Sequence, residues 1–63
     1  MLPNYRVTVQ TPPWLEPKFR EYPIRGCELK IALRAAKRAA ARRWGYRRTD
    51  LVAPFVREIH YVH

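Results

Sequence analysis

The sequence has no serine and only one cysteine, Cys27, among its 63 residues. A Ser-His-Asp triad and an internal disulfide are therefore excluded, and a cysteine-based zinc site would lack most of its ligands. We interpret Cys27 as a small buried hydrophobic residue rather than a nucleophile. The scarcity of cysteine favours a reducing, cytoplasmic setting.

Glycine is almost as scarce, and the residues that usually carry chemistry are scattered. Gly26 and Gly45 stand alone, so the chain has no glycine-rich phosphate loop. His60 and His63 are three residues apart, which in a strand places them on opposite faces and argues against a shared metal. The sequence predicts a protein that is not an enzyme and that binds no cofactor or metal.

Long apolar runs are also missing. No stretch approaches the ~18 residues of a membrane span, and the N-terminus lacks the basic and apolar regions of a signal peptide. A chain of 63 residues allows one domain, which buries only about 60% of its unfolded surface. We expect a single small, soluble domain over residues 1–63 whose stability is marginal without a partner.

Positive charge is what the chain has in excess, and this charge is concentrated. The net charge is +8, and residues 28–48 carry eight basic side chains against one acidic side chain, which accounts for +7 of it. A uniformly basic protein could owe its charge to solubility alone. A polarised one is better explained by an anionic partner.

Two strands are predicted before the basic segment. Residues 5–10 alternate apolar and polar side chains, which is typical of a half-buried strand with Tyr5, Val7 and Val9 on one face. The proline-rich run 11–17 then connects it to a weaker strand at 18–24. Proline lacks a backbone donor, so Pro23 favours an edge position for this second strand.

A helix over residues 27–44 is the clearest element. This segment contains neither proline nor glycine and is rich in the helix formers Ala, Leu, Lys and Arg. Gly45 follows it directly, and a glycine in the left-handed conformation commonly ends a helix. At ~100° per residue, one side of the helix is apolar and consists of Leu29, Leu33, Ala36, Ala40 and Trp44, flanked by Ala32 and Ala39. Because this stripe is narrow and rich in alanine, we expect the helix to lie close against a flat surface such as a sheet.

Pro54 precedes a third predicted strand at residues 55–62. Both alternating sets of its side chains include apolar residues, so we expect both of its faces to be partly covered. The predicted fold is a small α+β domain of order β-β-α-β, with a three-stranded sheet and one basic amphipathic helix on one face. The open face of the sheet would be a second binding surface or a homodimer contact. The layout resembles that of many short phage and plasmid proteins, and no residue motif assigns the chain to a family.

The basic face of the helix is the predicted functional surface. Five cations lie on it: Lys30, Arg34, Lys37, Arg38 and Arg42. Like charges four residues apart on a helix repel by a few tenths of a kcal/mol per pair, and only Glu28 offsets them here. An anionic partner explains this pattern better than an ordinary solvated face does.

The residues after the helix extend this basic surface. Arg43 complements the negative end of the helix dipole and Trp44 completes the apolar stripe, so both are assigned to the fold. Tyr46, Arg47 and Arg48 lie beyond the helix, and arginines beside aromatic residues are typical of nucleic-acid contacts. We therefore include Arg47 and Arg48 in the predicted site.

The proline-rich loop carries Trp14. The run 12–17 lacks the P-x-x-P spacing of ligands for SH3 and WW domains. We expect Trp14 to fold back onto the small core. The alternative is an exposed Trp14 that anchors a partner.

These features support two main hypotheses. The first is a non-enzymatic nucleic-acid-binding protein that grips the phosphate backbone of DNA or RNA with little sequence specificity, since the helix has no Asn or Gln to read adenine. The second is a small phage-encoded regulator or inhibitor that binds an acidic surface of a larger protein, with Trp14 and Tyr46 as partner contacts. A structural subunit of a ribonucleoprotein or virion ranks last, because the chain has no long basic tail.

Overall fold

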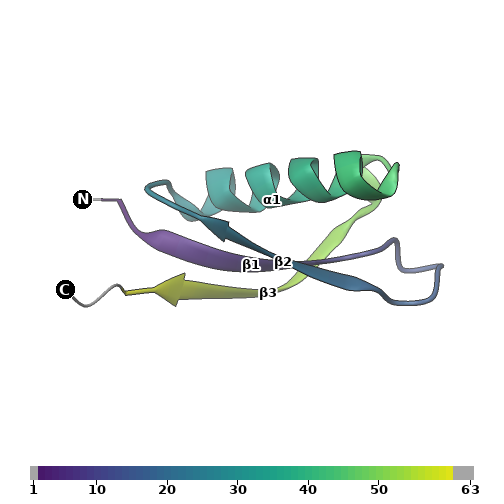
Figure 1. Cartoon of the computed structure of the whole chain (residues 1–63), viewed down its shortest axis with the longest axis horizontal. Helices are drawn as coiled ribbons and strands as arrows, with labels where there is room; N and C mark the ends of the chain where they lie inside the picture. Colours follow the sequence, from purple (N-terminus) through teal and green to yellow (C-terminus); the bar gives the residue numbers. More distant parts are fainter. Residues whose placement is uncertain (1, 61–63) are drawn as a thin grey trace.

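The computed structural model describes residues 2–60 as a three-stranded sheet with one long helix on one face (Figure 1). The elements in chain order are β1 (Asn4–Gln10), β2 (Phe19–Ile24), α1 (Leu29–Trp44), the 3-10 turn η1 (Arg48–Asp50) and β3 (Val52–Ile59). The predicted α+β class and the β-β-α-β order are confirmed. None of the helices in residues 2–60 has the length and apolar character needed to cross a membrane.

The sheet is antiparallel with the order β2-β1-β3, so β1 is the central strand. In the register, Val7 lies opposite Tyr22 on one side and Val56 on the other. Because β1 is paired on both sides and covered by the helix, Val7 and Val9 are fully buried, and Tyr5 on the same face packs against them. The predicted core face of the first strand is therefore confirmed.

The hairpin loop between β1 and β2 is held at its base by Thr11. The hydroxyl of this nearly buried residue donates to the carbonyl oxygen of Glu16 at 3.1 Å and accepts from the N–H of Lys18 at 3.0 Å. Pro12, the next residue, is fully buried. The prediction that Trp14 folds back onto the core is wrong, because Pro12 takes the inward place in the loop and Trp14 is 69% exposed.

Both outer strands contain a proline. Pro23 lies in the edge strand β2, as predicted. The third strand begins at Val52 rather than after Pro54, because β3 is the other edge strand, where a residue without an N–H is tolerated. The predicted end of this strand, at residues 61–62, lies outside the described residues.

The expectation that both faces of the third strand are partly covered is wrong for its central residues. Phe55 and Val56 point to opposite faces, and both are exposed. Val56 is exposed because α1 packs mainly over β1 and β2 and leaves β3 largely uncovered, whereas Phe55 lies on the face of the sheet away from α1.

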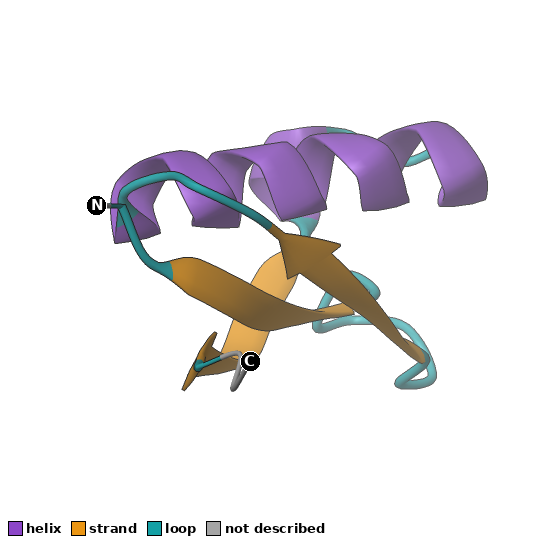
Figure 2. Ribbon diagram, turned by 60° about the vertical axis from the view of Figure 1, so that its left-hand side comes forward, coloured by secondary structure: helices purple, strands orange, loops and turns teal. Residues whose placement is uncertain are grey.

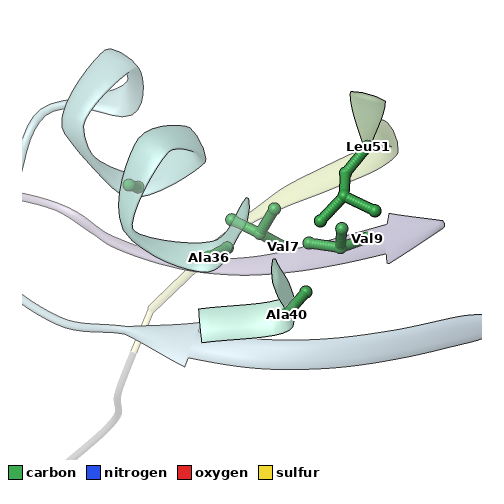
Figure 3. Packing of buried hydrophobic residues seen from close by; sticks show 6 residues of the cluster. Val7, Val9, Ala36, Ala40 and Leu51 are labelled. Atoms are coloured by element: carbon green, nitrogen blue, oxygen red, sulfur yellow. The ribbon is translucent and has the colours of Figure 1, made fainter. Parts of the chain in front are cut away.

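α1 lies along one face of the sheet (Figures 1 and 2), and alanine side chains make the contact. Ala32, Ala36 and Ala40 are fully buried, and Figure 3 shows Ala36 and Ala40 beside Val7, Val9 and Leu51. These three alanines are spaced by four, so they form one edge of the helix, which we call the alanine edge. Since alanine is the smallest side chain that keeps good helix propensity, this edge lets the helix backbone approach the sheet closely.

The predicted apolar stripe therefore needs correction. Leu33 and Trp44 lie half-buried beside the alanine edge, and Leu29 is 42% exposed instead of lying in the core. Large side chains do not fit on the line of closest approach, so they flank it. The helix starts at Leu29, two residues later than predicted, and ends as expected at Gly45, whose φ of 79° lets its N–H donate to the carbonyl of Ala41 at 2.8 Å.

The resulting core is small. Within residues 2–60, six hydrophobic residues form the buried cluster, namely Val7, Val9, Ala32, Ala36, Ala40 and Leu51. The large hydrophobic side chains left exposed outnumber them: Leu2, Trp14, Leu15, Phe19, Leu29, Ile31, Tyr46, Val52, Phe55 and Val56. The fold thus holds together with little buried apolar surface and retains much that a partner could cover.

The alanine edge predicts the effect of a larger side chain. We expect Ala36→Leu to lower the free energy of unfolding by about 1–3 kcal/mol, because the added carbons must push α1 away from Val7 and Val9. Ala35→Leu, one residue along on the half-exposed side, should change it by about 0.5 kcal/mol or less. Urea denaturation of both variants measures the difference. Equal stabilities would mean that the close helix–sheet contact does not exist.

Candidate nucleic-acid interface

The alanine edge determines where the basic side chains of α1 lie. With Ala32, Ala36 and Ala40 against the sheet, the opposite side of the helix faces solvent. Four of the five predicted cations are exposed there, and the fifth, Lys37, is half-buried at the border. The structure therefore gathers on one surface the residues that the sequence pattern placed together: Lys30, Arg34, Lys37, Arg38 and Arg42. We call this surface the basic face.

Nothing in residues 2–60 neutralises the basic face. The ion pair in this part of the chain joins Arg6 and Glu21 on the sheet at 2.9 Å, and no described carboxylate pairs with a cation of α1. The first turn of the helix contains no acidic residue, and Glu28 makes no capping hydrogen bond through its side chain. Among the described residues, the cations of the basic face therefore have no carboxylate that offsets their charge.

Beside the helix, the basic face extends into a hollow of about 240 Å³. The residues that line this basic hollow are Lys30, Leu33, Arg34, Lys37, Arg48 and Thr49. The short turn η1 brings Arg48 and Thr49 back along the side of α1, so residues from two elements meet there.

The lining of the basic hollow has side chains of the kind that can hold an anion. Four of its six lining residues are cations and none is a carboxylate, although Asp50 is next to Thr49 in sequence. The Thr49 hydroxyl adds a neutral donor, and the Leu33 side chain supplies an apolar wall. Charge-assisted hydrogen bonds from several cations to one group are the usual means of holding phosphate or carboxylate.

The structure separates the other predicted site residues. Arg38 and Arg42 belong to the basic face but not to the basic hollow, and Arg47 is exposed and lines neither. Tyr46 is also exposed. Arg43 is exposed in the last turn of the helix, where its positive charge lies near the negative end of the helix dipole, as expected.

Leu33 and Thr49 were not predicted as site residues. Leu33 was assigned to the core, and Thr49 belongs to a 3-10 turn that carries no strong sequence signal. The useful signal was the shortness of the connection from Gly45 to Val52, which forces the chain to return along the side of α1.

A second hollow, of about 410 Å³, lies on the sheet and has a different character. Its lining is Arg6, Thr8, Glu21, Phe55, Val56 and Arg57. Charges of both signs and apolar side chains meet there, and Glu21 already pairs with Arg6. An anion is better accommodated by the basic hollow, which has no acid.

The other residues considered from the sequence do not form a site in the described part of the chain. Within residues 2–60, no three His, Cys, Asp or Glu side chains are placed to share a metal ion. Cys27 is half-buried against the core, and its N–H donates to the carbonyl of Pro3 at 3.2 Å. His60 is exposed, and His63 lies outside the described residues.

The fold and the site define a small α+β domain with an uncompensated basic helix face. Comparison of the chain with protein-family models, with curated protein sequences and with solved structures found no match.

The charges of the basic face predict a measurable self-repulsion. Arg38 is four residues from both Arg34 and Arg42, so Arg38→Gln should raise the free energy of unfolding by about 0.4–1 kcal/mol at low salt. The gain should shrink at high salt, where exposed charges are screened. Arg38→Lys keeps the charge and similar helix propensity and should show no gain. If Arg38→Lys raised the free energy of unfolding equally, or if high salt left the increase unchanged, repulsion between charges would not be its cause.

Proposed function

We propose that this protein is a non-enzymatic nucleic-acid-binding protein that holds the phosphate backbone with the basic face of α1. The observation that carries the proposal is the basic hollow, in which Lys30, Arg34, Lys37 and Arg48 converge without an acid. Tolerating this concentration of like charge costs stability, and an anion in the hollow removes that cost.

The dimensions of the basic face suit a backbone with repeated phosphates. Lys30 and Arg42 are twelve residues apart, which is ~18 Å along a helix. Phosphates recur every ~3.4 Å per strand along duplex DNA, so the face spans several of them. A helix also fits the major groove of B-DNA, where long cationic side chains reach the backbone on both walls. One phosphate in the basic hollow would fix the register, and Arg38 and Arg42 would contact its neighbours.

Little sequence specificity follows from the side chains available. α1 contains no Asn or Gln to read adenine, so base contacts would be limited to arginine with guanine. Most of the affinity would then come from counterion release, which is independent of sequence. A cytoplasmic location, where Cys27 stays reduced and nucleic acid is at hand, is part of this proposal.

One observation favours a second function, that of a small regulator bound to an acidic surface of a larger protein. Trp14 is exposed at the hairpin loop, and tryptophan is enriched among the residues that dominate protein interfaces. The two functions differ in which residue matters. Trp14→Ala should abolish a protein complex and leave binding to phosphates almost unchanged.

Salt dependence tests the primary proposal. If about five phosphates are neutralised, the logarithm of the binding constant for a short DNA duplex should fall with the logarithm of salt concentration with a slope of about −4.5. Arg34→Gln combined with Arg38→Gln removes two contacts and should reduce the slope to about −2.7. Fluorescence anisotropy over a range of salt concentrations measures both slopes.

The matched control is Lys18→Gln combined with Arg20→Gln, which removes the same charge from the β1–β2 hairpin instead of α1. This variant should keep the wild-type slope. Equal losses in the two variants would show that net charge, not the basic face, drives binding. No binding of DNA or RNA at low salt would contradict the proposal altogether, and a protein partner that survives nuclease treatment and depends on Trp14 would favour the second function.

A further inference from the structure

The face of the sheet turned away from α1 is uncovered and carries large aromatic side chains. Val7 and Val9 point toward the helix, so Thr8 and Gln10 point to the open face together with their cross-strand partners. Those partners include Phe55, opposite Thr8, and Phe19, opposite Gln10. They are 67% and 57% exposed, respectively. Two phenylalanines from the edge strands thus flank the central strand on the open face.

The charges on this face come in both signs. Arg6 on β1 lies directly opposite Arg57 on β3, a cross-strand pair of like charges that is unfavourable by itself. Glu21 on β2 pairs with Arg6, while Arg57 has no carboxylate partner within residues 2–60. The open face therefore carries one unmatched cation next to an ion pair whose carboxylate still has free acceptor capacity.

The total exposed area indicates how much surface remains to be covered. The chain exposes 4940 Å², whereas a folded monomer of 7.6 kDa exposes about 4,300 Å². The exposed area is thus somewhat above that of an average monomer, and Phe19 and Phe55 contribute to it on the open face. Together with a core of six small or medium side chains, their exposure leaves apolar surface that a partner can cover.

We propose that a second copy of this chain covers the open face, so that the native form is a homodimer with the layers α/β/β/α. A two-fold axis running along β1 places β2 of each copy over β3 of the other. Phe19 and Phe55 then fill the space between the sheets, and Glu21 of each copy comes within reach of Arg57 of the other. Each Glu21 carboxylate then accepts from its own Arg6 and from that Arg57, so two carboxylates are shared among the four arginines of the interface.

Self-association suits this face better than a nucleic acid does. Glu21 lines the 410 Å³ hollow and offsets part of the charge of Arg6 and Arg57, so this face attracts phosphate less than the basic hollow does, whereas an isologous interface needs both signs of charge on the same patch. Stacked bases on Phe19 and Phe55 would leave that carboxylate facing the backbone.

If the proposed function holds, a dimer would bind two nucleic-acid segments at once. α1 and the open face lie on opposite sides of the sheet (Figure 2), so the two basic faces of a dimer point away from each other. Three layer spacings of about 10 Å separate the two helix axes by roughly 30 Å. One dimer therefore holds two nucleic-acid segments on opposite sides and bridges them.

The dimer is tested by the mass of the protein in solution. Sedimentation equilibrium of the wild type should give twice the chain mass of 7.6 kDa at micromolar concentration. Phe55→Gln, which leaves the net charge unchanged, should weaken self-association by about 30-fold or more, as expected for a central interface residue. Trp14→Gln removes an equally exposed aromatic from the hairpin loop and should leave the dimer intact.

Charge reversal identifies the pairing. Glu21→Arg alone and Arg57→Glu alone should each weaken self-association, and mixing the two variants should give a heterodimer of nearly wild-type affinity, because opposite charges then face each other only between unlike copies. A wild-type protein that stays monomeric at millimolar concentration would overturn the proposal. So would a monomer whose Phe55 resonances shift on adding single-stranded oligonucleotide, which would assign the face to bases instead.

An assay in which the protein bridges two DNA duplexes distinguishes the proposed nucleic-acid binding from the proposed dimer. Wild-type protein should capture a labelled duplex on beads that carry a second duplex, whereas Phe55→Gln should bind one duplex with unchanged affinity and fail to capture the other. A dimer that binds no duplex would refute the proposed function and leave the dimer standing. A monomer that binds duplex would do the reverse.

Discussion

The close contact between the alanine edge of α1 and the central strand β1 is the constraint on which the rest of the structure depends. Ala32, Ala36 and Ala40 form one buried cluster with Val7 and Val9, so this edge of the helix faces the sheet. Small side chains allow this approach but bury little apolar area each, and the hydrophobic driving force scales with that area. The same contact that fixes the fold therefore leaves it weakly stabilised, which explains why so many large hydrophobic side chains remain on the surface.

The orientation of α1 also produces the basic face. Alanines and cations both recur every four residues, so burying the first set turns the second set to solvent. The connection after Gly45 then has to return along the side of the helix to start β3, and η1 adds Arg48 and Thr49 to one side of the basic face. A surface with converging cations on one side of the sheet and a mixed aromatic surface on the other gives the protein two distinct binding faces. The two proposals assign one partner to each.

Much of this architecture was readable from the sequence because its signals are local. Alternation marked the first strand, the run without proline or glycine marked the helix, and Gly45 marked its end. The predictions that were wrong concern side chains whose positions depend on tertiary packing. Trp14 faces out because Pro12 takes the buried place in a loop tied by Thr11, and Leu29 lies outside the core because alanines occupy the line of closest approach. Which of the adjacent residues Arg47 and Arg48 joins the basic hollow depends on the turn η1, which neither composition nor periodicity specifies.

Binding of a nucleic-acid backbone to the basic face and the basic hollow can be mapped by residue-resolved NMR with a short DNA duplex. Backbone amide resonances of residues 30–42 and 48–49 should shift on titration, and those of Phe19, Phe55 and the hairpin loop should not. Shifts centred on the sheet or the hairpin, with residues 30–42 unaffected, would contradict it.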